Sequence, residues 1–208
     1  MAEPPGLRAR KKEATRLALH EAALRLAAEQ GADRLHVEAI ADAANVSRRT
    51  FSNYFSSKEE ALFYDDAVRL RRMLELVRDR PADEAPWRVL SRAAEQLTAE
   101  ALDEPDPSWL ARRRQLRAHP GLLAHQVAAY STIERDLATE LAPRLTGADV
   151  ELRSRILAAT FLSTLRVATQ HWIENPRGSL LGAVRAGLRL AASNGTPGSW
   201  VRAVAGSS

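Results

Sequence analysis

Apolar residues recur at helical spacing along most of the chain. In the first segment Leu19, Ala23 and Leu26 fall on one helical face, and Gly31 supplies the left-handed residue that ends the helix. Prolines and similar apolar stripes divide the remainder into further segments, and no alternating strand pattern interrupts them. We therefore predict an all-α fold of about nine helices.

A long helix is predicted to begin after residue 57. Ser57 and Glu60 have the spacing of a capping box, and an apolar stripe continues from Phe63 until Pro81 closes the helix. We expect the boundary between two domains to lie inside this helix, near residues 58–66. A boundary within a continuous helix lets that helix pass motion from one domain to the other.

Prolines also delimit the helices predicted for the second half of the chain. The final residues are rich in Gly and Ser, so we expect a disordered tail at 195–208. The apolar stripes predict further helices approximately at residues 87–101, 108–118, 123–141, 150–174 and 179–193.

Composition agrees with helices and limits the available chemistry. Ala, Leu and Arg are abundant, whereas Cys is absent, which excludes disulfides and thiolate metal sites. The N-terminal sequence lacks the pattern of a secretion signal, and no apolar run approaches the roughly 20 residues that span a bilayer. We expect a soluble, cytoplasmic protein with no membrane partner, no cofactor and no metal.

Positive charge is concentrated near the N-terminus. Five Arg and Lys residues lie between Arg8 and Arg16 against Glu13 alone, although the formal net charge of the chain is only +4. We expect residues 1–9 to form a disordered arm, and a basic arm ahead of a helical domain often contacts phosphates. The alternative is a solvated tail without a partner.

Residues 37–54 have the pattern of a helix-turn-helix, with two short helical segments around a three-residue turn. Asn45 tolerates the positive φ that such a turn requires, and Ser47 can cap the second segment. In DNA-binding proteins of this kind the second helix begins at the major groove. This placement would bring Arg48 and Arg49 to the base edges.

The motif predicts contacts to both bases and phosphates. Arg forms bidentate bonds with guanine, while hydroxyl groups, Lys and helix N-termini hold phosphates. The alternative is a pair of packed helices with no role in nucleic-acid binding. The candidate DNA-binding residues are His36, Ser47, Arg48, Arg49, Thr50, Asn53, Tyr54 and Lys58.

The segment from Thr15 to Leu62 resembles the TetR family of transcriptional regulators. The chain departs from the family pattern at five positions. His20 and Ala27 replace bulkier apolar residues, and Asn45 replaces the usual Gly. Ser52 stands where Tyr is common, and Ser56 replaces a frequent Pro. Ser52 lacks the ring with which that Tyr often contacts DNA. The agreement rests on Thr15-Arg16, Gly31, Val37, Ile40-Ala41, Val46-Ser47, Thr50, Tyr54-Phe55 and Ser57-Lys58-Glu59.

The resemblance implies a dimeric regulator in which residues 1–60 bind DNA through three helices. Residues 61–194 would then form a helical domain for ligand binding and dimerisation. A subgroup resemblance implies a repressor that a small hydrophobic or acyl-CoA-like effector releases from double-stranded operator DNA. The subgroup is actinobacterial and mycofactocin regulator-like. Three segments of this chain resemble it: Ser47-Arg48-Arg49-Thr50-Phe51, Arg80-Pro81-Ala82-Asp83-Glu84 and His119-Pro120-Gly121-Leu122.

A ligand pocket is expected where polar residues interrupt the apolar stripes of the middle helices. The arginine run at 112–114, with Arg117 and His119, can hold the phosphates of a nucleotide-bearing ligand. The alternative is a solvated helix face. The candidate ligand-binding residues are Arg114, Gln126, Tyr130, Arg166 and Gln170.

Two apolar stripes near the C-terminus predict a dimer interface. As the TetR resemblance implies, two helices from each subunit would form a four-helix bundle. The alternative is that these stripes complete the core of the subunit itself. The candidate interface residues are Leu157, Phe161, Leu165, Trp172, Val184 and Leu188.

An enzyme is the main competing class of protein. The sequence has no Ser/His/Asp arrangement at recognisable spacing, no Gly-rich phosphate loop and no His-x-x-x-His pair, so we assign no catalytic residue. A second alternative is a DNA-binding regulator without a small-molecule ligand. Loss of operator binding in the presence of a ligand would distinguish our prediction from this alternative.

Overall fold

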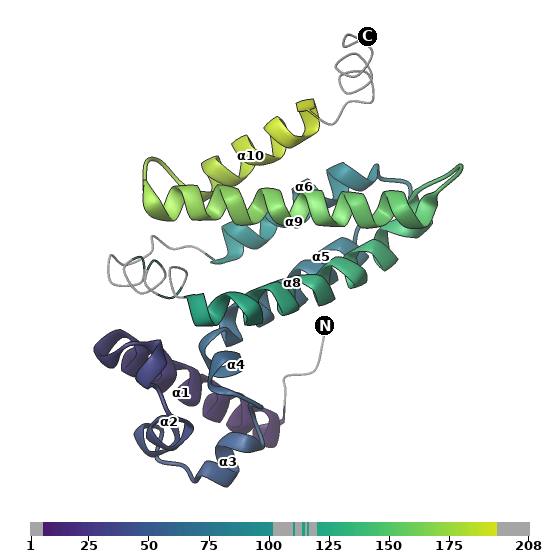
Figure 1. The fold of residues 1–208 in the computed structure, drawn as a ribbon. Helices are drawn as coiled ribbons and strands as arrows, with labels where there is room; N and C mark the ends of the chain where they lie inside the picture. The colour runs from purple at the N-terminus through teal and green to yellow at the C-terminus, as the bar shows by residue number, and fades with distance from the viewer. Residues whose placement is uncertain (1–5, 102–109, 111–113, 115, 117–119, 195–208) are drawn as a thin grey trace. The chain divides into compact units, whose positions relative to one another are not determined.

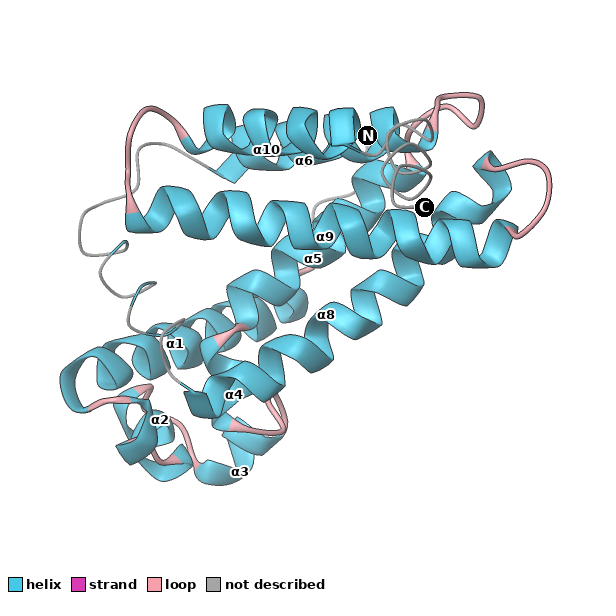
Figure 2. Cartoon of the chain, turned by 45° about the horizontal axis from the view of Figure 1, so that its top comes forward, coloured by secondary structure: helices cyan, strands magenta, loops and turns pink. Residues whose placement is uncertain are grey.

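The computed structural model describes residues 6–101, 110, 114, 116 and 120–194. Within these ranges the chain forms nine α-helices and two short 3₁₀ helices and contains no β-strand (Figures 1 and 2), which confirms the predicted fold class. The predicted tail at 195–208 and most of the predicted helix 108–118 lie outside the described residues. The elements are α1 (Leu7–Gln30), η1 (Ala32–Arg34), α2 (Val37–Ala43), α3 (Arg48–Ser52), α4 (Lys58–Leu62), α5 (Tyr64–Arg78), α6 (Pro86–Ala101), α8 (Pro120–Leu141), η2 (Ala142–Arg144), α9 (Val150–Glu174) and α10 (Leu180–Asn194).

The chain divides into two compact units, each with a buried apolar cluster of its own. The first unit comprises residues 1–68 and 107–127, and the second comprises residues 69–106 and 128–208. The division therefore falls within α5, just after the range 58–66 in which the sequence analysis placed the domain boundary.

The first unit is built around α1. This helix ends at Gln30 because Gly31 adopts a φ of +86°, which L side chains rarely adopt, and the Gly31 N–H still bonds to the carbonyl of Ala27 at 3.0 Å. The large side chains that α1, α2, α3 and the segments flanking them bury together fix how the helix-turn-helix packs. They include Leu19, Leu35, Ile40, Phe51 and Phe55.

Helix α1 begins at Leu7, which corrects the prediction of a disordered arm through residue 9. Residues 7–16 contain helix-favouring Leu, Ala, Arg, Lys and Glu, with neither Gly nor Pro. Tertiary contacts hold this end: Glu13 accepts a hydrogen bond from the Tyr64 hydroxyl at 2.6 Å. The basic residues of this segment therefore stand on a helix.

The long helix predicted to follow Ser57 is in fact two helices, α4 and α5, with Phe63 between them. In a continuous α-helix the carbonyl of Ala61 would accept the N–H four residues later. Here that oxygen lies 2.7 Å from Nδ1 of the buried His20, a residue of α1. A side chain that inserts into the hydrogen-bond ladder is a known cause of helix kinks, and His20 accounts for the break.

The second unit packs α6, α9, α10 and most of α5 and α8 around one apolar core. Helices α9 and α10 approach closely, since a Cβ atom added to Gly187 would lie 3.0 Å from the Cβ of Ala168. At the far end of α5, Arg144 donates hydrogen bonds to the carbonyls of Val77 and Arg80 at 3.1 and 3.0 Å. These bonds tie η2 to the end of α5 and to the residues that follow it.

Candidate nucleic-acid interface

The start of α3 is held by the turn that precedes it. Asn45 has a φ of +54°, as predicted, and this conformation turns the chain between α2 and α3. Ser47 caps α3 as predicted: its Oγ accepts the backbone N–H of Thr50 at 3.0 Å and lies 2.9 Å from the hydroxyl of the same residue. The N-terminal turn of α3 therefore has a defined orientation.

Two arginines occupy the first turn of α3, and both side chains are exposed. Arg48 forms an ion pair with Glu38 of α2, with 3.1 Å between Nη1 and Oε1. The sequence analysis did not single out Glu38, because its pairing depends on how α2 and α3 cross. Arg48 and Arg49 are placed as a DNA-reading helix requires, and their contact with DNA stays a prediction.

The remaining candidates surround this turn unevenly. Asn53 follows the last residue of α3 and is exposed, and His36 is exposed at the N-cap position of α2. Tyr54 is half-buried, and the guanidinium carbon of Arg16 lies 5.8 Å from the centroid of its ring. This contact brings a cation of α1 next to the end of α3, and the sequence analysis did not anticipate it.

Lys58 occupies a different environment from the one predicted. Its ammonium group donates hydrogen bonds to the carbonyls of Ala32 and Leu35 at 2.9 and 3.0 Å and lies 3.4 Å from that of Asp33. An ammonium has three N–H donors, and these carbonyls use them within the protein. Lys58 therefore ties the start of α4 to the segment around η1, and its contact with a phosphate stays a prediction.

The predicted capping box at α4 is shifted by one residue. Ser57 Oγ accepts the N–H of Glu60 at 3.1 Å, as expected. The Glu60 carboxylate, however, accepts hydrogen bonds from the N–H and the hydroxyl of Ser56 at 2.6 and 2.7 Å. The Pro that is frequent at position 56 has no N–H, so Ser56 supplies a cap that the family's common residue cannot.

The predicted ligand-binding residues are not gathered around one described cavity. Tyr130 is half-buried against the core of the second unit, while Arg166 is exposed on α9. Gln170 donates to Glu174 on the same helix at 2.9 Å. Arg114 is exposed, and Gln126 belongs to α8, but its side chain lies outside the described part of the structure.

The predicted dimer residues face the interior of the subunit. Phe161, Trp172, Val184 and Leu188 are buried in the core, and Leu157 and Leu165 pack against it. These six side chains therefore contribute to the subunit's own core, and the dimer interface itself stays a prediction. These residues lie on the more apolar of the two faces of each helix, and the core takes that face.

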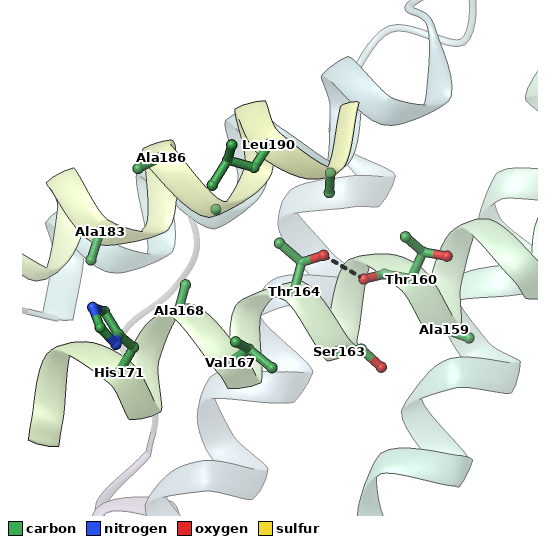
Figure 3. A pocket seen from close by; sticks show the side chains of 12 residues that line it. Ala159, Thr160, Ser163, Thr164, Val167, Ala168, His171, Ala183, Ala186 and Leu190 are labelled. Carbon is green, nitrogen blue, oxygen red and sulfur yellow. Dashed lines mark hydrogen bonds between the residues drawn. The ribbon is translucent and has the colours of Figure 1, made fainter. Parts of the chain in front are cut away.

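The opposite face of α9 and α10 is open and apolar. It contains a groove of about 810 Å³ whose lining consists mainly of Ala, Thr and Gly side chains from these two helices. Figure 3 shows Thr164 and Ala168 of α9 beside Ala186 and Leu190 of α10. Exposed apolar side chains continue this face along both helices: Leu152, Ile156, Val167 and Leu190.

Comparison with known proteins agrees with both halves of the fold. Residues 19–63 match the bacterial regulatory proteins of the tetR family, and residues 84–195 match the MftR C-terminal domain. The HTH-type transcriptional regulator TcmR of Streptomyces glaucescens is 33% identical over 175 residues, which cover 81% of this chain and 77% of TcmR.

Solved structures share the architecture. A TetR-family regulator from Streptomyces coelicolor A3 has a TM-score of 0.57 at 20% identity and covers 93% of this chain and 98% of its own. The regulator FadR from Bacillus subtilis, solved in complex with stearoyl-CoA, has a TM-score of 0.52 at 21% identity, with coverages of 85% and 97%.

Two expectations drawn from the sequence can be set beside these findings. No helix in the described part of the chain is long and apolar enough to cross a membrane. The matching proteins are transcriptional regulators, in agreement with the prediction that the chain is not an enzyme. The chain belongs to the TetR family of DNA-binding transcriptional regulators and carries a C-terminal domain of the MftR type.

Proposed function

We propose that the protein is a homodimeric repressor whose two α3 helices enter successive major grooves of a palindromic operator. The observation that carries this proposal is the start of α3, where Ser47 caps the helix and the side chains of Arg48 and Arg49 are exposed. Helix-turn-helix motifs direct this end of the second helix toward the base edges. Successive grooves on one side of DNA lie roughly 34 Å apart, and a two-fold dimer can match that spacing.

A second copy of the chain is the partner that we assign to the open face of α9 and α10. Ile156 and Val167 of α9 and Leu190 of α10 each expose more than half of their residue surface, at 54%, 55% and 64%. Two helices from each subunit make a four-helix bundle, and the small residues of the groove allow close packing. In a two-fold dimer each groove would receive the apolar side chains of the other subunit.

The effector that we propose is an apolar, acyl-bearing metabolite of the acyl-CoA type. The MftR-type C-terminal domain and the shared fold of FadR, which holds stearoyl-CoA in the Bacillus subtilis protein, support this choice. The arginine run at 112–114, of which only Arg114 lies among the described residues, would supply cations for phosphates. The alternative function is that of a DNA-binding regulator without a small-molecule ligand.

Release from DNA would follow from differential binding. A ligand shifts a protein only toward the state that it binds better, here one in which the α3 helices are at the wrong separation. A coupling of about 1 to 3 kcal/mol would weaken operator binding roughly 5- to 150-fold. By linkage, operator DNA must weaken the ligand by the same factor.

Titration of acyl-CoAs of increasing chain length against a protein–operator complex tests the effector. Fluorescence anisotropy of labelled operator should show release in the roughly 5- to 150-fold range. Unchanged operator affinity at saturating acyl-CoA would leave the alternative, a DNA-binding regulator without a small-molecule ligand. Mass spectrometry of the denatured, purified protein would detect an effector that co-purifies.

Replacement of a single arginine tests the placement of α3. Arg49→Ala should weaken operator binding by about 1 to 3 kcal/mol. Arg25→Ala is the matched control, because Arg25 is an exposed cation of α1 that pairs with Glu29 at 3.7 Å on its own helix. Equal effects of the two variants would contradict the proposed role of α3.

A further inference from the structure

The ion pair between Glu38 and Arg48 joins the two helices of the DNA-binding motif. Glu38 lies in the first turn of α2, and Arg48 is the first residue of α3. Their charged atoms are 3.1 Å apart, and the side chains are 56% and 73% exposed. The pair therefore lies on the surface that would approach DNA, and it forms only because the turn brings the two helices together.

The carboxylate changes which atoms Arg48 can offer to DNA. A guanidinium has five N–H donors in a planar fork, and Glu38 occupies the Nη1 corner. The edge formed by Nε and Nη2 stays available, and one such edge suffices for a bidentate bond to O6 and N7 of guanine. An arginine without this carboxylate would be drawn more strongly to the nearest phosphate.

We propose that Glu38 is a specificity-determining residue, which positions Arg48 so that its free edge meets a guanine in each half-site. The proposal rests on the DNA binding proposed above. Glu38 also places a negative charge near the DNA backbone, which lowers affinity for unrelated sequences. Together these effects raise the preference of the protein for its operator over other DNA.

Substitution of Glu38 in the full-length protein tests this proposal by DNA selection and by competition binding. Glu38→Gln should weaken the guanine preference at one base pair of each half-site by roughly 1.4- to 5-fold, the range of an exposed ion pair. Affinity for unrelated DNA should rise. Glu38→Asp keeps the charge but withdraws the carboxylate, so it should lose the base preference without the gain in non-specific affinity.

Two controls separate positioning from charge. In an Arg48→Ala background, Glu38→Gln should leave every base preference unchanged, because the positioned side chain is gone. Glu29→Gln removes an exposed carboxylate of α1 that pairs with Arg25, and it should raise affinity for all sequences alike. Circular dichroism and urea unfolding of each variant verify that the motif is folded.

The outcomes distinguish this proposal from the one on which it depends. If the wild-type protein selects a palindrome and Glu38→Gln acts as Glu29→Gln does, Glu38 is an ordinary surface carboxylate and the inference is overturned. If the wild-type protein selects no sequence at all, the proposed operator binding itself fails.

Discussion

The imidazole of His20 lies against the backbone of α4, with Nδ1 2.7 Å from the carbonyl oxygen of Ala61. Because a carbonyl oxygen can only accept, Nδ1 carries the proton in this contact. The bond joins α1 to the last turn of α4 and uses an acceptor that a continuous helix would have needed for its own ladder. It therefore holds α4 on the helix-turn-helix and ends that helix before α5.

Replacement of His20 with Leu removes this donor while keeping an apolar body of similar size. The carbonyl of Ala61 loses its partner, and the contact of Nε2 with the Asp65 carboxylate at 3.2 Å is lost as well. The free energy of unfolding should therefore fall by about 1 to 3 kcal/mol. Urea denaturation measures the change. Thr15→Val, which removes an exposed hydroxyl bonded to the Lys11 carbonyl, should shift the midpoint much less. An unaltered midpoint for His20→Leu would show that the contact does not stabilise the fold.

The ammonium of Lys58 gives a second prediction, because it bonds to carbonyls within the protein. Lys58→Met should lower the free energy of unfolding by about 1 to 3 kcal/mol. The slope of log affinity for DNA against log salt should stay unchanged. The opposite result would be a Lys58→Met variant that is as stable as the wild type and whose slope is smaller by about 0.9, the value for one lost phosphate contact. That result would show that Lys58 contacts a DNA phosphate.

The two faces of α9 and α10 predict opposite results for glutamate substitutions. Val167→Glu places a charge on the open face, so the protein should become monomeric while the subunit stays folded. Leu188→Glu places a charge in the subunit core, where Leu188 is only 3% exposed, so the subunit should unfold. Sedimentation and circular dichroism separate the outcomes. A folded monomer from Leu188→Glu would contradict the assigned faces.

Acid should remove one surface interaction of the second unit. Hydrogen bonds from Arg72 and then Gln96 hold the pKa of Glu100 below its ordinary value. The folded-state pKa is the lower one, so this stabilisation is present above the ordinary Glu pKa and is lost as pH falls through the folded value. Glu100→Gln should therefore unfold more easily than the wild type at neutral pH. A difference between the two urea midpoints that does not shrink as the pH is lowered would contradict this.

The helix-turn-helix could be predicted in detail because its signals are local. Asn45 and Ser47 act on the residues next to them, so a turn with positive φ and a cap follow directly from residue type. The break at Phe63 could not be predicted in the same way. Its cause, His20, lies on another helix, and only tertiary packing brings it to Ala61.

The face of α9 that we propose for dimerisation could not be chosen from apolarity alone. Both faces carry apolar side chains, represented by Phe161 inside and Ile156 outside. A helix that is apolar on more than one side is expected to be covered on both sides. The pattern does not tell which side packs in the subunit's own core and which side packs against a partner. The contact between Glu38 and Arg48 was equally hidden, since it depends on the crossing of two helices.

The most direct test of the account is an unbiased DNA selection with the full-length protein, followed by sequencing of the bound duplexes. The account predicts a palindrome whose half-sites are separated by about one helical turn or a multiple of it, bound by a dimer. Arg48→Ala and Arg49→Ala should each relax or weaken recognition within the half-site. Enrichment of no palindrome by the wild-type protein would contradict the central claim.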